Sequence, residues 1–197
     1  MNRQEISVII PALDEEASIA RAILSCREAG PCEVIVVDGG SRDRTAEIAR
    51  GRADAVIAAP RGRAAQMNAG AAVAGGKILL FLHADTLLPG GAVPVVLDAL
   101  HDPAVIGGAF RVRLSPSLGA DRYVRAMLWI TGRMIGARAS ASRSYSGDQA
   151  IFVRAEPFRT VGGYPEIPLM EDIELSRRMR RTGKTVLLPL RVGTSGR

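Results

Sequence analysis

The most constraining feature of the chain is a regular alternation of short apolar stretches with segments of helical spacing. Four stretches rich in β-branched residues have the pattern of buried strands, and each is followed by a helix-like segment. These strands are expected at residues 6–13, 33–38, 54–60 and 77–85. The alternation predicts an α/β fold with a mostly parallel sheet flanked by helices on both faces.

The second half of the chain loses this regular alternation. A helix is expected at 170–184, where acidic residues come first and basic residues last, the order that suits a helix dipole. Strands are expected at 105–114, 149–154 and 185–190. No internal repeat, low-complexity tract or interdomain linker is visible, so we expect a single domain.

Two acidic residues end predicted strands, at the edge where a parallel sheet binds its ligands. Asp38 ends the second strand and Asp85 ends the fourth. Taken singly, each has an ordinary structural explanation, because Asp38 precedes a Gly-Gly turn and Asp85 would cap the next helix. Asp172, at the start of the 170–184 helix, has the same ambiguity. The placement of Asp38 and Asp85 is a first indication of a ligand site at this edge of the sheet.

The sequence lacks the motifs of several common classes of nucleotide-binding protein and hydrolase. The chain has no GxGxxG after its first predicted strand, no GxxxxGK[ST] and no GxSxG. Aromatic residues make up 4% of the chain, too few for a platform that stacks single-stranded nucleic acid, and we expect no nucleic-acid partner. Carboxylates, arginines and a metal ion remain as the working groups.

The charge of the chain favours anionic partners. Its net charge is +6, and all but two of its 26 basic residues are arginines, whose planar guanidinium suits phosphate. A codon bias toward arginine is the alternative explanation. Cys26 and Cys32 form neither a metal-ligand pattern nor a disulfide framework, and we find no signal peptide and no apolar run of about 18 residues. A cytoplasmic location is therefore expected.

Five motifs, in order, resemble those of family 2 glycosyltransferases with the GT-A fold. They are ISVIIPALDEE, VIVVDGGSRDRTAEIA, RGRAAQMNAGA, ILLFLHADT, and GDQAIFVR followed by VGGYPEIPLMEDIELSRRMRR. The resemblance extends to the subgroup associated with radical-SAM and selenium-domain proteins, and it covers Ile6 to about Thr194. It implies one domain, residues 1–197, with a nucleotide-sugar-binding half (1–103) that runs into an acceptor-binding half (104–197).

The resemblance also implies roles for individual residues. Asp172 matches the general base, and Asp85 would hold a divalent cation, Mg²⁺ or Mn²⁺. Donor contacts are implied for Pro11, Leu13, Glu15, Asp38, Gly39, Arg63, Gln66, His83, Ala84 and Asp85, and acceptor contacts for Asp148, Gln149 and Glu171. His83 departs from the family, because it replaces the first acid of the DxD motif. A ribose contact and metal ligation are both open for it.

The implied reaction is transfer of a sugar from a nucleotide-sugar donor to a hydroxyl acceptor, with inversion. Two alternatives stay open. A nucleotidyltransferase would carry a Gly/Arg-rich phosphate loop where this chain has Asp14-Glu15-Glu16, and a non-catalytic nucleotide-sugar-binding module would not need the Asp172 carboxylate.

Segment 119–138 mixes apolar residues with arginines and has two interpretations. It is either an amphipathic helix packed into the core, or a face that meets a lipid-linked acceptor or an anionic membrane surface as a peripheral contact. Family members usually continue past the last strand with a basic and apolar tail, so a truncated form is one expectation for a chain that stops at Arg197.

Overall fold

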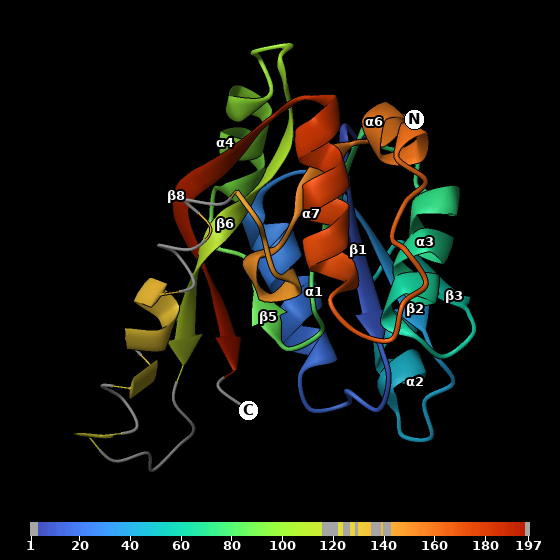
Figure 1. Ribbon diagram of the computed structural model, residues 1–197. Helices are drawn as coiled ribbons and strands as arrows, with labels where there is room; N and C mark the ends of the chain where they lie inside the picture. The colour runs from blue at the N-terminus through green and yellow to red at the C-terminus, as the bar shows by residue number, and fades with distance from the viewer. Residues whose placement is uncertain are drawn as a thin grey trace.

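A computed structural model describes residues 4–115, 122–123, 127–128, 130–134, 139 and 143–195. The described strands form one eight-stranded sheet in the order β3-β2-β1-β4-β7-β6-β8-β5. Helices cover both faces of this sheet (Figure 1). The α/β fold class predicted from the alternating pattern is confirmed.

The first half of the sheet is parallel. β1 (Ile6–Ala12) pairs with both β2 (Glu33–Asp38) and β4 (Ile78–Phe81), and β2 also pairs with β3 (Ala55–Ala58). These strands form at the four predicted apolar stretches. Because their carboxyl ends share one edge, they place the loops that follow them side by side.

The second half of the sheet mixes directions. β7 (Phe152–Arg154) runs antiparallel to β4 and to β6 (Val105–Ser115), and β8 (Lys184–Ser195) runs parallel to β6 and antiparallel to β5 (Thr86–Leu87). β7 begins later than the predicted 149–154 strand, because the residues before it form the short 3-10 helix η1 (Gly147–Gln149).

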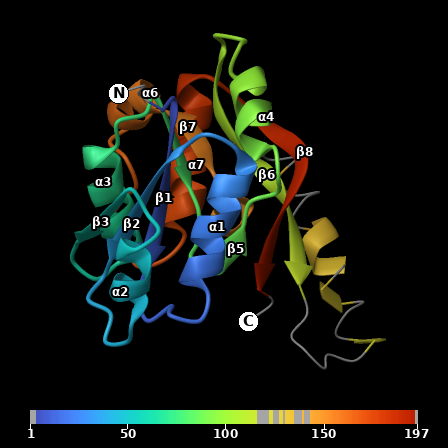
Figure 2. The same cartoon turned by 180° about the vertical axis from the view of Figure 1, so that it is seen from behind.

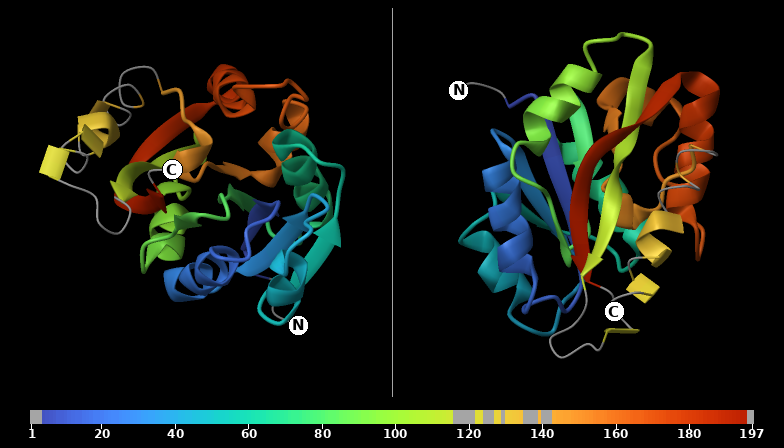
Figure 3. Two further views of the ribbon diagram at one scale, coloured as in Figure 1. Left: turned by 90° about the horizontal axis from the view of Figure 1, so that it is seen from below. Right: turned by 90° about the vertical axis from the view of Figure 1, so that its left-hand side faces the viewer.

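Described helices pack on both faces of the sheet, as the opposite views in Figures 1 and 2 show. One face carries α1 (Ile19–Ala29), α2 (Thr45–Arg50) and α4 (Ala92–Ala99), and the other carries α3 (Arg63–Val73), α6 (Ala155–Thr160) and α7 (Glu171–Thr182). The side view in Figure 3 shows the sheet as a layer between them. Alternate side chains of the strands supply the two buried apolar clusters.

Helix α3 lies unusually close to the sheet, at a glycine. A Cβ on Gly70 would overlap the side chain of Ile9 in β1 and come within 2.9 Å of Val37 in β2. Closer to the start of α3, the Gln66 amide bonds the carbonyls of Ala12 and Val37, so this end of the helix lies beside the carboxyl ends of β1 and β2.

The acidic residues after β1 do not start a helix as predicted. α1 begins at Ile19, and residues 14–16 lie in the preceding loop. The backbone N–H groups of Asp14 and Glu15 donate to Ser41 Oγ (3.0 Å) and Thr45 Oγ1 (2.7 Å), and the Asp14 carboxylate accepts from the Arg42 N–H (2.7 Å). The acids therefore join this loop to the loop after β2.

Asp85 also differs from its predicted place. β4 ends at Phe81, four residues earlier, and Asp85 lies in a turn closed by a hydrogen bond from Thr86 N to the His83 carbonyl (3.0 Å). The next element is β5, and α4 begins only at Ala92. The structural alternative, that Asp85 caps the next helix, is wrong.

Candidate active site

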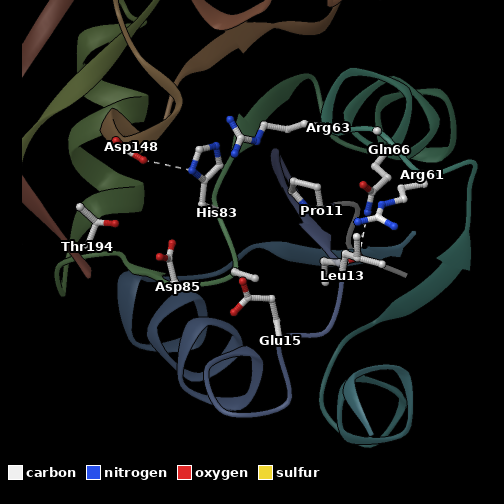
Figure 4. Close-up of a pocket in the computed structure, with 13 residues that line it drawn as sticks. Pro11, Leu13, Glu15, Arg61, Arg63, Gln66, His83, Asp85, Asp148 and Thr194 are labelled. Carbon is white, nitrogen blue, oxygen red and sulfur yellow. Dashed lines mark hydrogen bonds and ion pairs between the residues drawn. The ribbon is translucent and has the colours of Figure 1, made fainter. Parts of the chain in front are cut away.

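A cavity of about 500 Å³ opens at the carboxyl edge of the parallel strands. Its walls come from the end of β1, the loop before α3, the turn after β4, η1 and the end of β8. The lining residues are Pro11, Ala12, Leu13, Glu15, Arg61, Gly62, Arg63, Gln66, His83, Ala84, Asp85, Asp148 and Thr194. Nine of these were predicted from the sequence as donor or acceptor contacts. Segments far apart in the chain therefore meet here (Figure 4).

One wall of the cavity is positively charged. Arg61 and Arg63 flank Gly62, which adopts a φ of 142° and precedes the first turn of α3. The side chain of Arg63 is 55% exposed, so its guanidinium can reach a ligand in the cavity. Unpaired N–H groups and the positive end of the dipole at a helix start favour anions. Two guanidinium groups at such a start suit the phosphates of a nucleotide.

Carboxylates from three separate segments also line the cavity: Glu15 after β1, Asp85 after β4 and Asp148 in η1. Among the described residues, no three His, Cys, Asp or Glu side chains gather into a metal site. A hard cation such as Mg²⁺ typically takes one or two protein carboxylates and completes its shell with water and substrate phosphates. Asp85, facing a cavity with a phosphate-suited wall, fits that mode of binding.

His83 and Asp148 form a close pair at the boundary between the two halves of the chain. Nδ1 of His83 lies 3.2 Å from Oδ1 of Asp148, as the dashed line in Figure 4 marks. The hydrogen bond from His83 lowers the pKa of Asp148 below its ordinary value; burial opposes this, and the positive charge of Arg63 assists it. Asp148 is therefore an ionised acceptor of hydrogen bonds at neutral pH.

The first two residues of α7 lie beside the cavity rather than in its lining. Asp172 is half-buried: its Oδ2 accepts from the Gly147 N–H and its Oδ1 from the Ile173 N–H (2.7 Å). Glu171 is buried, and its Oε1 lies 3.4 Å from Nη1 of Arg63. The two neighbouring acids therefore contact different walls of the cavity, Asp172 the η1 turn and Glu171 the start of α3.

Four of the predicted site residues make hydrogen bonds within the fold itself: Asp38, Gly39, Gln66 and Gln149. The Asp38 carboxylate accepts from the N–H groups of Gly40 (3.2 Å) and Ser41 (3.2 Å), and neither Asp38 nor Gly39 lines the cavity. Gln66 lines it but is 4% exposed, and its amide is held by backbone carbonyls.

Gln149 is fully buried in the same way. Its Nε2 donates to the Phe110 carbonyl (3.1 Å), and its Oε1 accepts from the Ser146 N–H (3.1 Å). A direct contact between the Gln149 amide and an acceptor would require these bonds to break.

Sequence reasoning missed four lining residues: Ala12, Arg61, Gly62 and Thr194. The pattern Arg-Gly-Arg before a helix could have identified Arg61 and Gly62. Thr194 comes close to the turn after β4 only through the pairing of β8 with β5, where its hydroxyl bonds that of Thr86 (3.0 Å). No local pattern could have predicted that contact.

The interpretation of segment 119–138 as a core helix is not supported by its described residues. Tyr123, Met127, Ile130 and Met134 are between 50% and 68% exposed, and they recur at the spacing of one helical face. Trp129, Arg125 and Arg138 lie outside the described residues. No helix within the described ranges is long and apolar enough to cross a bilayer.

The fold and the cavity define an α/β protein with a ligand-sized cavity at the carboxyl edge of its sheet, one wall of which suits phosphate. The chain belongs to glycosyl transferase family 2, whose family model matches residues 7–154. The undecaprenyl-phosphate 4-deoxy-4-formamido-L-arabinose transferase of Pectobacterium atrosepticum is 30% identical over 128 residues, which are 58% of this chain and 39% of that protein. The chain thus spans about two fifths of the length of this relative.

Solved structures share the fold at lower identity. A mannosyltransferase from Pyrobaculum calidifontis in complex with GDP-Man and Mn²⁺ superposes with a TM-score of 0.75 at 22% identity, over 98% of this chain and 57% of that one. Glucosyl-3-phosphoglycerate synthase from Mycobacterium tuberculosis, with Mn²⁺, UDP-glucose and phosphoglyceric acid, gives 0.69 at 20%, over 98% and 73%. At this level of identity the likeness shows the GT-A fold.

Proposed function

We propose that this chain transfers a sugar from a nucleotide-sugar donor to a hydroxyl acceptor, with inversion at the anomeric carbon. The observation that carries the proposal is the cavity itself. Its walls bring a cationic helix start, a cation-suited carboxylate and an η1 turn bonded to the Asp172 carboxylate to one edge of the sheet. Membership of glycosyl transferase family 2 supports this reading.

The donor occupies the cavity with its diphosphate on the Arg61–Arg63 wall. Pro11, Leu13 and Glu15, at the end of β1, face the nucleoside. A divalent cation, Mg²⁺ or Mn²⁺, would be held by Asp85 and would offset the negative charge that develops on the leaving diphosphate. The fold neighbours crystallised with nucleotide-sugars and Mn²⁺ support this use of a cation.

Asp172 acts as the general base. The acceptor hydroxyl loses its proton to the Asp172 carboxylate as its oxygen bonds to the anomeric carbon. The bond from that carbon to the diphosphate breaks at the same time, and its electron pair leaves with the nucleoside diphosphate. Attack on the face opposite the leaving group inverts the anomeric configuration. The N–H groups of Gly147 and Ile173 hold the carboxylate in place for this step.

We further propose that the acceptor is lipid-linked and that the protein works as a peripheral protein at the cytoplasmic face of a membrane. The relative that acts on undecaprenyl phosphate suggests such an acceptor. The exposed apolar face of segment 119–138 supports a membrane contact, as do Ile167, Leu169 and Met170, three exposed side chains in the loop that leads to Asp172. Both cysteines are free thiols, in keeping with a reducing compartment. We also place the chain in the radical-SAM/selenium-associated subgroup, on its motifs alone.

An assay of the released nucleotide tests the proposal against its alternatives. A transferase incubated with a nucleotide-sugar and acceptor extract releases nucleoside diphosphate, whereas a nucleotidyltransferase releases pyrophosphate from a nucleoside triphosphate. If the chain is only a binding module, the nucleotide should raise the melting temperature of the protein, and neither product should be released. Release of pyrophosphate, or binding without turnover, would overturn the proposal.

A further inference from the structure

His83 occupies the position where the DxD motif has its first acid. Both nitrogens of its ring face the η1 turn, at Gly147 and Asp148. Nδ1 lies 3.2 Å from Asp148 Oδ1 and donates the hydrogen bond between them. Nε2 is buried and has no hydrogen-bond partner among the described residues. Neither ring nitrogen is therefore directed at a ligand in the cavity.

The buried edge of the ring fits against a glycine. A Cβ at Gly147 would overlap Nε2 of His83, so the imidazole can occupy this place only because residue 147 has no side chain. His83 thus contacts two consecutive residues of η1: the backbone of Gly147 by packing and the carboxylate of Asp148 by a hydrogen bond.

The same turn holds the proposed base. The Gly147 N–H donates to Asp172 Oδ2, and Ser176 of α7 bonds both the N–H (3.1 Å) and the carbonyl (3.2 Å) of Tyr145, just before the turn. A displacement of Gly147 would consequently move one of the two N–H groups that orient the Asp172 carboxylate. A single residue, Gly147, therefore links His83 to Asp172.

We infer that His83 is a positioning residue for the transfer step. It fixes the Gly147-Asp148 turn, so that Gly147 orients Asp172 and Asp148 presents its carboxylate to the cavity. It replaces the first acid of the motif without replacing that acid's contact with the donor or the cation. The kinetic form of this inference rests on the proposed function.

Three substitutions at position 83 separate this role from that of a ligand. His83→Asn keeps an N–H near the place of Nδ1, His83→Ala removes it, and His83→Asp restores the usual acid of the family but sets it against Asp148. We expect kcat to fall about 100-fold in the Ala variant, because small misplacements of a catalytic group have effects of this size. The Asn variant should recover most of that loss, and the Asp variant should be no better than Ala.

The affinity for nucleoside diphosphate with Mn²⁺, measured by titration calorimetry, should stay within about threefold of wild type in the Ala and Asn variants. His101→Ala, at the other histidine of the chain, is a matched control, because His101 follows the end of α4, does not line the cavity and has a side chain that is 83% exposed. It should leave kcat and affinity unchanged. Circular dichroism melts would show that each variant is folded.

The opposite results overturn the inference. Loss of diphosphate affinity in His83→Ala, or a gain of activity or Mn²⁺ affinity in His83→Asp, would make His83 a donor or metal ligand. Equal kcat values in all three variants and wild type would remove the positioning role. A wild-type chain without transfer would refute the proposed function instead. The contact would then be tested by a double-mutant cycle of His83→Ala and Asp148→Ala in urea unfolding, where additive effects would refute it.

Discussion

The guanidinium of Arg63 lies 3.4 Å from the carboxylate of Glu171 and joins the start of α3 to the start of α7. Glu171 is almost fully buried, whereas Arg63 remains half-exposed toward the cavity. Glu171 therefore contacts Arg63 from the protein interior, while the exposed part of the guanidinium stays available to a ligand in the cavity.

Replacing Arg63 should weaken donor binding rather than slow the transfer step. We expect Arg63→Ala to lower the affinity for nucleoside diphosphate about 10- to 100-fold, the effect of losing a hydrogen bond to a charged group. Titration calorimetry measures this directly. Arg159→Ala, an exposed arginine on α6, is the control and should bind as wild type does. Equal affinities in the two variants would remove Arg63 from the diphosphate site.

Asp85 should make donor binding depend on a divalent cation. In the wild type, Mn²⁺ should strengthen nucleoside diphosphate binding, and in Asp85→Ala the affinity should fall and become insensitive to Mn²⁺. Asp98→Ala is the control, because the side chain of Asp98 on α4 is 87% exposed, and this variant should keep the metal dependence. An unchanged Mn²⁺ response in Asp85→Ala would show that the cation, if used, binds elsewhere.

Much of the fold follows from local patterns, but the site depends on contacts that no local pattern contains. The strands β1, β2 and β4 coincide with runs of apolar residues, because burial on both faces demands such runs. The sequence also placed Asp85 and Arg63 near a shared edge. The pairing of His83 with Asp148 links residues 65 positions apart, on different halves of the chain, so the sequence alone could not separate a ligand role for His83 from a packing role.

The contacts of Gln66 are likewise distant in sequence and are not contained in any local pattern. From the motif, Gln66 was expected to contact the donor, yet its Nε2 donates to the carbonyls of Ala12 (2.9 Å) and Val37 (2.8 Å) at the ends of two strands. Gln66→Glu would set carboxylate oxygens against these carbonyls, and Gln66→Ala would leave them without that donor. We expect each to lower the free energy of unfolding by about 1–3 kcal/mol, the cost of unmet buried hydrogen bonds. Urea unfolding with unchanged stability would contradict this structural role.

The exposed apolar face of segment 119–138 should bind anionic membranes. We expect the protein to sediment with vesicles rich in anionic lipid at low salt and to be released in part at high salt, since surface attraction is screened within about 10 Å at 0.1 M salt. Met127→Gln with Met134→Gln should weaken sedimentation. Leu24→Gln, at a leucine that is 57% exposed on α1, is the matched control. Wild-type protein that stays in the supernatant at low salt would refute the membrane contact.

The turnover of Asp172→Asn, measured together with donor affinity, tests the central claim most directly. Asparagine cannot take the acceptor proton at neutral pH, so we expect acceptor-dependent release of nucleoside diphosphate to fall at least about 100-fold. Nucleoside diphosphate affinity should stay within about threefold, because Asp172 lies outside the cavity lining. The amide also sets an NH₂ group against one of two backbone N–H donors, so a loss of about 1–3 kcal/mol in stability is expected.

Two neighbouring acids sharpen the reading of this result. Glu174→Gln, in the same turn of α7, should leave turnover within about twofold, and Glu171→Gln should lower it by less than about tenfold. We expect Asp172→Asn to fold and bind the donor but to lose transfer, while Glu174→Gln keeps it. Near-wild-type transfer by Asp172→Asn would contradict the general-base role of Asp172, and abolition of transfer by Glu171→Gln alone would assign the base to the adjacent residue.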